Sequence, residues 1–219
     1  MSILKSACVA LALGALAASS MAPASAQPAK RPNILLIVAD DLGYNDIGSF
    51  GSEINTPNLD KLATGGVRLT GYYTTPFCSP TRSILMSGTD NHLVGFGDMA
   101  ELMTNDVRGK PGYEGRLNDR VVPLPQVLHD AGYRTVMAGK WHLGNNENIN
   151  SRGFDRSFAQ MSGGASHWSD QMGIVAFDPA KPPRADYREN GQSITLPKDF
   201  YSSDAYASKI IEYLDQTKG

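Results

Sequence analysis

Apolar runs and turn residues alternate along the chain in a pattern that predicts strand–helix–strand units. Residues 34–39 form an uninterrupted apolar run, which is typical of a central parallel strand with helices on both faces. The Thr-Pro pair at 56–57 predicts the start of a helix over 58–64, which the glycines at 65–66 end. A β-rich stretch at 67–73 follows. This order predicts an α/β fold, with a mostly parallel central sheet flanked by helices.

A second helix and a long loop come next. Residues 78–86 predict a helix, because Pro80 suits its first turn and Gly88 can close it. Cys78 then stands at or just before a helix N-terminus. Residues 89–122 are rich in Gly, Asn and Asp and have no sustained period, which indicates a long functional loop.

The rest of the chain predicts two further helices and one strand. Residues 124–131 predict a short helix ended by Gly132, and residues 134–138 predict the strand that follows. The segment 145–197 is polar and rich in turn residues, so we expect irregular structure there. An amphipathic pattern predicts a helix over 203–218.

The first 26 residues have the pattern of a cleavable signal peptide. Lys5 precedes an apolar run at about 8–18, and the small residues at 24–26 form a cleavage pattern before Gln27. The apolar run is short for a membrane span, although an uncleaved anchor is the alternative. We expect the export machinery to deliver the mature chain to the periplasm or the medium, with no stable membrane anchor.

Charge and cysteine content narrow the classes of protein. The formal net charge is −2 and no basic footprint is present, which argues against a nucleic-acid partner. The chain has two cysteines, and Cys8 lies within the predicted signal peptide. Cys78 therefore has no partner for a disulfide or for simple thiol redox chemistry.

Acidic residues directly follow the first predicted strand. Asp40 and Asp41 offer two hard oxygen ligands at a strand's carboxyl end, where ligands collect in parallel sheets. Such a pair suits Ca²⁺ or Mg²⁺. Turn formation is the alternative explanation of the same dipeptide.

Cys78 and Arg82 are separated by one helical turn. The positive end of the helix and the guanidinium both favour an anionic group at position 78. The pair is a candidate nucleophile with its charge stabiliser. A buried apolar cysteine is the alternative.

Lys140 and His142 flank Trp141, just after the predicted strand 134–138. In an extended segment their side chains point to the same side, where a cation and an imidazole suit a sulfate or phosphate group. A solvated lysine and a hydrogen-bonded histidine are the alternative. His92 in the long loop is a candidate for lining the site, whereas His129 is expected at the surface.

Three connections therefore deliver polar groups to what we expect to be one edge of one sheet. They carry the Asp40–Asp41 pair, the Cys78–Arg82 pair and the Lys140–His142 pair.

Two long motifs resemble those of a known family. Residues 78–88, Cys-Ser-Pro-Thr-Arg-Ser-Ile-Leu-Met-Ser-Gly, are similar to the first signature of type I sulfatases. Residues 132–144, which end in Gly-Lys-Trp-His-Leu-Gly, resemble the second. The similarity extends from about Arg31 to the last residue and is greatest to bacterial arylsulfatases of the alkaline phosphatase superfamily. It implies an alkaline phosphatase-like fold and the hydrolysis of sulfate esters.

The resemblance implies a role for the lone cysteine. In this family a maturation enzyme oxidises it to Cα-formylglycine, whose hydrated aldehyde is the nucleophile. One hydroxyl of the hydrate attacks sulfur, and deprotonation of the other expels sulfate without a second attack. A serine at position 78 would form the ester but would lack that exit.

The resemblance also implies roles for the residues around it. Asp40 and Asp41, with the modified Cys78, would ligate Ca²⁺ rather than Mg²⁺. The basic residues Arg82 and Lys140 would steady the hydrate and bind the sulfate oxygens. His142 would take the proton from the second hydroxyl, and His167 is a candidate substrate-pocket residue.

Further family residues lie beyond this sequence. They are two more metal ligands, a second histidine and a second lysine. We therefore expect residues 27–219 to be an incomplete N-terminal part of the catalytic domain, truncated and nearly inactive alone. A phosphonate or phosphate monoester hydrolase of the same superfamily and a non-catalytic metal- or sulfate-binding module are the alternatives.

Overall fold

The computed structural model describes residues 31–174, 180 and 182–216 of the chain. Its contacts divide the chain at Gly43, so that residues 31–43 and residues 44–216 belong to separate units and are described separately. The predicted signal peptide at 1–26 lies outside the described residues. No helix in the described part of the chain is both long and apolar enough to span a membrane.

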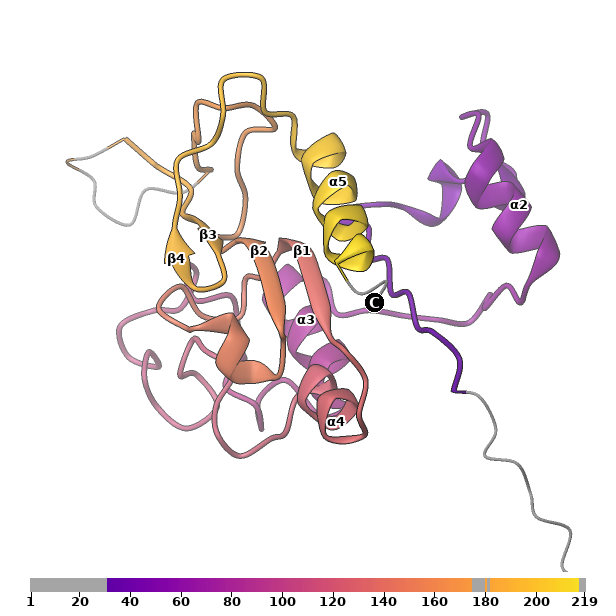
Figure 1. Cartoon of the computed structure of the whole chain (residues 1–219). Coiled ribbons are helices and arrows are strands. Elements are labelled where there is room, and N and C mark those ends of the chain that lie inside the picture. The colour runs from indigo at the N-terminus through magenta and orange to yellow at the C-terminus, as the bar shows by residue number, and fades with distance from the viewer. Residues whose placement is uncertain (1–30, 175–179, 181, 217–219) are drawn as a thin grey trace, which may run out of the picture. The chain divides into compact units, whose positions relative to one another are not determined.

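The larger unit contains a four-stranded sheet in the order β1-β2-β3-β4 (Figure 1). The first two strands are parallel, and the other neighbouring pairs are antiparallel. The expected α/β class is confirmed, and the described sheet is mixed and open. The expectation of irregular structure over 145–197 is wrong in part, because the last three strands of the sheet lie in that segment and pair with β1 or with one another. The strands are β1 (Val136–Lys140), β2 (Arg156–Gln160), β3 (Tyr187–Glu189) and β4 (Gln192–Ser193).

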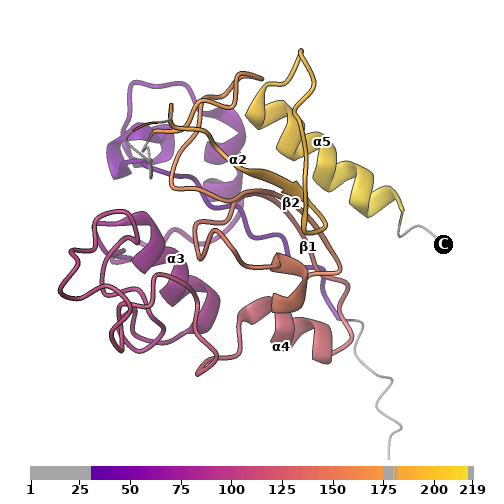
Figure 2. The same cartoon turned by 90° about the vertical axis from the view of Figure 1, so that its left-hand side faces the viewer.

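A helix forms in each of the four predicted segments, and residues 217–218 of the last prediction lie outside the described residues. Figure 2 shows the β1–β2 pair between α5 on one side and α3 and α4 on the other, and α5 contacts both strands. The helices are α2 (Pro57–Gly65), α3 (Cys78–Ser87), α4 (Leu124–Asp130) and α5 (Ser202–Asp215), with short 3₁₀ turns η1 (Tyr44–Asp46), η2 (Gly48–Phe50) and η3 (Ile149–Arg152).

Helix ends follow the expected turn chemistry, with one difference. Gly88 closes α3 in the left-handed conformation, and its N–H donates to the carbonyl of Ile84 at 2.8 Å. Thr56 stands at the N-cap of α2, but its hydroxyl does not cap the helix. It accepts from the N–H of Gly48 at 2.9 Å and donates to Asp60 at 3.0 Å, so it links η2 to α2.

Two predicted strands are absent from the described structure. Residues 34–39 and 67–73 have no strand assignment. The apolar side chains of Ile34–Val38 are 42% to 73% exposed, and Val67 and Tyr73 are more than 80% exposed. An apolar run indicates that side chains can be buried, but a strand also needs a neighbour to pair its backbone groups. No described segment pairs with either run.

Apolar side chains cover both faces of the sheet. Phe158 on β2 packs toward α5, whereas its neighbour Ala159 faces the opposite cluster, as strand alternation requires. The cluster toward α5 contains Phe158, Ala185, Tyr187, Leu196, Phe200 and Tyr213. The opposite cluster contains Val94, Phe96, Leu117, Trp141, Leu143, Ile149, Ala159 and Met161.

The loop 89–122 contributes to this second cluster. No helix or strand is assigned in it, as predicted. Its Val94, Phe96 and Leu117 are nevertheless fully buried against the sheet. The loop is therefore a packed layer of the core, and it holds the polar side chains near it in fixed positions.

Gly153 follows η3 and shows how tightly the end of η3 packs on α4. Its φ is +94°, and a Cβ there would overlap the backbone of Gln126 in α4. Gly109 has φ +80°, and a Cβ at this residue would meet no atom within 4 Å.

We expect Gly109→Ala to lower the free energy of unfolding by about 1–2 kcal/mol, the cost of a left-handed alanine. Gly153→Ala should cost clearly more, because it adds a backbone overlap to the same strain. Urea denaturation of both variants measures the difference. Equal losses would contradict the close packing of η3 on α4.

Candidate active site

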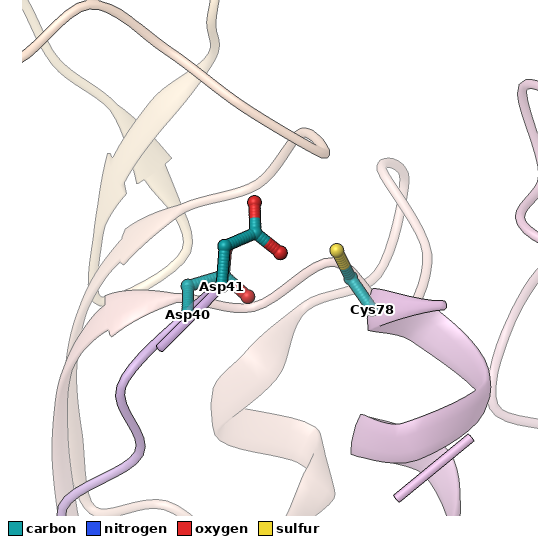
Figure 3. Close-up of side chains that lie close together, drawn as sticks. All are labelled: Asp40, Asp41 and Cys78. Atoms are coloured by element: carbon teal, nitrogen blue, oxygen red, sulfur yellow. The ribbon is translucent and has the colours of Figure 1, made fainter. Parts of the chain in front are cut away.

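The two acidic residues of the smaller unit lie next to each other (Figure 3). Asp41 has a left-handed backbone, with φ +54°. Successive side chains of an extended chain point to opposite sides, and the left-handed residue breaks that alternation. The carboxylate oxygens of Asp40 and Asp41 lie within 4.8 Å of each other, and both residues are exposed. Their oxygens can therefore serve one cation.

Cys78 is the first residue of α3, as predicted. Phe77 is the N-cap residue in extended conformation, and the Cys78 side chain projects from the first turn with a free thiol (Figure 3). The residue is half-buried. The positive end of the helix dipole lies beside this side chain and favours negative charge there.

Arg82 joins this helix to the end of β1. Its Nη1 donates to the carbonyl oxygen of Lys140 at 2.7 Å, across 58 positions of sequence. The contact confirms that the predicted Cys78–Arg82 and Lys140–His142 motifs meet. The expected approach of Arg82 to the side chain of Cys78 stays a prediction.

The backbone after β1 continues along β2. The N–H of Trp141 donates to Gln160 at 2.8 Å, and that of His142 donates to Met161 at 3.2 Å. Trp141 is buried in the core. His142 has φ +56°, so the extended alternation assumed for Lys140 and His142 holds only as far as Trp141. Strand alternation does not extend to His142, so the expectation that Lys140 and His142 point to the same side stays a prediction.

A glutamate from the long loop contacts His142. Oε1 of Glu101 lies 2.9 Å from Nε2 of His142, and the two side chains are only 7% and 6% exposed. Nδ1 of His142 is buried, and no hydrogen-bond partner for it occurs among the described residues. The ring is thus held by a hydrogen bond at Nε2, whereas Nδ1 has no hydrogen-bond partner among the described residues.

Glu101 was not predicted from the sequence. It lies 41 positions from His142 within a loop without periodicity, and no motif distinguishes it from other acidic residues there. Burial works to raise the pKa of Glu101, but the hydrogen bond and charge of His142, together with the charge of Lys140, hold it below the ordinary 4.5. Glu101 is therefore an ionised partner of the histidine.

Comparison with known proteins places these motifs in a family. The family model described as Sulfatase matches residues 32–219. The chain belongs to the sulfatase family.

Sulfatases from several organisms are similar in sequence to this chain. An uncharacterized sulfatase of Schizosaccharomyces pombe is 49% identical over 192 residues, which cover 84% of this chain and 35% of the relative. An arylsulfatase of Klebsiella aerogenes is 43% identical over 196 residues, or 89% of this chain and 41% of the relative. The chain thus spans about two fifths of these relatives.

Solved structures agree with the fold. The crystal structure of Ps i-CgsB superposes with a TM-score of 0.68 at 29% identity, covering 85% of this chain and 42% of that one. The sulfatase PsFucS1 from Pseudoalteromonas sp. superposes at 0.61 and 24% identity, with 85% and 41% covered. The predicted alkaline phosphatase-like α/β fold is confirmed for this sulfatase chain.

The remaining histidines lie at the surface. His92 is 56% exposed at its side chain and contacts Asp90 and the ring of Tyr113. Nδ1 of His167 lies 2.6 Å from the hydroxyl of Ser202 at the start of α5, so His167 links its loop to that helix. Their assignment to the substrate pocket stays a prediction. His129 is exposed, as expected, near Asp130 and Asp155.

The lowered pKa of Glu101 makes a prediction about stability. As the pH falls below 4.5, the unfolded chain takes up the proton before the folded chain does. The stability that ionised Glu101 contributes is therefore complete above that pH and is lost as the pH falls through the lowered folded pKa.

We expect the free energy of unfolding of Glu101→Gln to decline less steeply below pH 4.5 than that of the wild type. Urea denaturation at a series of pH values measures the two slopes. Identical slopes would show that Glu101 is not held ionised in the folded chain.

Proposed function

We propose that this chain carries the nucleophile-bearing part of a sulfuric ester hydrolase that acts on arylsulfatase-type substrates. The observation that supports this most is the hydrogen bond from Arg82 to Lys140, which joins the two sulfatase motifs on α3 and β1. Arylsulfatases such as that of Klebsiella aerogenes share sequence across the same region. The proposal concerns the full-length protein of which this chain provides at least two signatures.

Cys78 is the proposed site of the nucleophile. Its position at the first residue of α3 places the helix dipole where negative charge develops. A maturation enzyme of the host would convert it to Cα-formylglycine, which supplies a hydrated aldehyde for attack on sulfur. A single exported thiol without a disulfide partner is consistent with a precursor of this kind.

Asp40 and Asp41 are the proposed protein ligands of a divalent cation, together with the modified Cys78. Paired carboxylates with oxygens within 4.8 Å of each other fit a hard cation such as Ca²⁺. A thiol is a soft ligand that suits such an ion poorly, whereas the oxygens of formylglycine complete an all-oxygen set. The donor chemistry therefore favours Ca²⁺ and the modified side chain together. When bound, the cation would supply positive charge against the sulfate group.

Three further residues have proposed roles in charge and proton handling. Lys140 contributes a cation that binds sulfate oxygens, and Arg82 holds the end of β1 against α3 while its charge favours the anion. His142 accepts a proton at Nδ1, the buried nitrogen without a described partner. His92 and His167 are proposed to line the substrate pocket.

Maturation and location follow from the same proposal. The export machinery would carry the precursor out of the cytoplasm, and residues 1–26 would be removed. The enzyme would then act on the sulfate ester in the periplasm or the medium. The metal ligands and leaving-group acid still needed would come from other parts of the full-length protein.

Cys78→Ala in the full-length protein should reduce turnover of 4-nitrophenyl sulfate by about 10⁴-fold or more, because the nucleophile is lost. Cys78→Ser should form a sulfate ester once and then stop. Mass spectrometry of the peptide containing residue 78 checks both this ester and the wild-type formylglycine.

Ser79→Ala is the matched control on the same helix turn. The Ser79 hydroxyl is buried and makes no described hydrogen bond, so its loss should leave turnover within a few-fold of wild type. Fully active protein that retains an ordinary thiol at Cys78 would contradict the proposal. Faster turnover of phosphate than of sulfate esters would favour the phosphate hydrolase alternative.

Asp40→Asn and Asp41→Asn should each weaken Ca²⁺ binding at least about tenfold, because a direct anionic ligand is lost. Isothermal titration of the full-length protein with Ca²⁺ measures this. Glu53→Gln, which removes an exposed carboxylate of the larger unit, is the control for general charge effects. Unchanged affinity in both aspartate variants would show that the pair does not bind the cation.

A further inference from the structure

We propose that Glu101 is a positioning residue that fixes the tautomer and orientation of His142, so that Nδ1 is the nitrogen that accepts the proton. The catalytic part of this inference, proton transfer to Nδ1, rests on the proposed function. The structural part, the tautomer and orientation of the His142 ring, can be tested without measuring turnover.

The tautomer follows from the chemistry of the buried pair. An ionised carboxylate can only accept hydrogen bonds, so the contact of 2.9 Å between Glu101 Oε1 and His142 Nε2 requires a proton on Nε2. Oε2 of the same carboxylate lies 3.3 Å from that nitrogen. In the neutral ring, Nδ1 then carries the lone pair. This buried nitrogen has no described hydrogen-bond partner and is ready to act as a base.

The backbone of Gly163 lies against the contact between Glu101 and His142. A Cβ at Gly163 would lie 2.5 Å from Oε1 of Glu101 and 2.9 Å from both Cε1 and Nε2 of His142. Real side chains do not tolerate such distances, so the backbone of residue 163 presses directly on the contact between the two groups. The backbone of His142 is itself left-handed, with φ +56°.

Burial strengthens the interaction between the Glu101 carboxylate and the His142 ring, because water screens it little. Both side chains are more than nine-tenths buried, and the other charge that acts on Glu101 is the cation of Lys140 at the end of β1. Proton uptake at Nδ1 would create an imidazolium, which the adjacent carboxylate stabilises. Glu101 therefore both selects the accepting nitrogen and favours its protonated product.

The first test observes the ring directly. In the ¹⁵N-labelled full-length protein, the ring nitrogen signals of His142 are assigned by their loss in His142→Gln. At a pH where the ring is neutral, we expect the proton on Nε2 in the wild type and a mixture of tautomers in Glu101→Gln. A wild-type ring protonated on Nδ1 would overturn the inference, whether or not Glu101→Gln folds.

The second test measures kinetics on sulfate esters. Glu101→Gln should lower kcat by roughly 10²-fold or more with little change in KM, because the base is misoriented while substrate contacts remain. Glu101→Asp should recover part of kcat, because it keeps the charge on a shorter side chain.

Two further variants separate positioning from general stability. Gly163→Ala keeps both partners but wedges them apart, so it should reproduce the kcat loss and the tautomer mixture. Glu114→Gln removes another partly buried carboxylate of the same loop, one that pairs with Arg120 at 2.8 Å, and should leave both readouts as in the wild type.

The outcomes distinguish the inference from the proposed function. An unchanged kcat in Glu101→Gln, in protein that turns over sulfate esters, would overturn the positioning role. The expected tautomers in protein that turns over no sulfate ester would instead contradict the proposed function, while the assignment of the His142 tautomer would stand.

Discussion

The hydrogen bond from Arg82 to the carbonyl oxygen of Lys140 is the contact on which the candidate site depends. It connects the first turns of α3 to the end of β1, and these elements bring the two sulfatase motifs from positions 58 residues apart. A charged donor to a partly buried carbonyl is a strong hydrogen bond, and its direction is fixed by the planar guanidinium.

A second constraint comes from left-handed backbone at non-glycine residues. Asp41 and His142 both have φ near +55° directly after apolar, extended stretches. This conformation is costly for residues with a Cβ, and it is found where surrounding structure holds it in place. At both positions it breaks strand alternation and re-aims a functional side chain. At His142 the resulting ring orientation coincides with the packing of Glu101 and Gly163.

The long loop 89–122 shows why a lack of periodicity does not mean a lack of order. Its buried apolar residues form part of the core against β1 and β2, so packing holds the loop in place although it has no regular secondary structure. The packing of the loop sets the position of Glu101. A loop of this kind can carry a functional carboxylate with the precision that His142 requires.

Local sequence was enough to predict the helices, the strand that became β1, and the identity of most candidate residues. Helix starts and stops depend on local residues such as Pro57 and Gly88. Each sulfatase motif is a single uninterrupted stretch of sequence, so both can be recognised without the structure. The strands expected at 34–39 and 67–73 did not form in the described structure, because pairing requires a neighbour that local pattern cannot supply. Tertiary packing alone brings Glu101 to His142 and leaves Nδ1 without a described partner. That contact joins segments 41 residues apart through packing around Gly163, and no local preference of either segment encodes it.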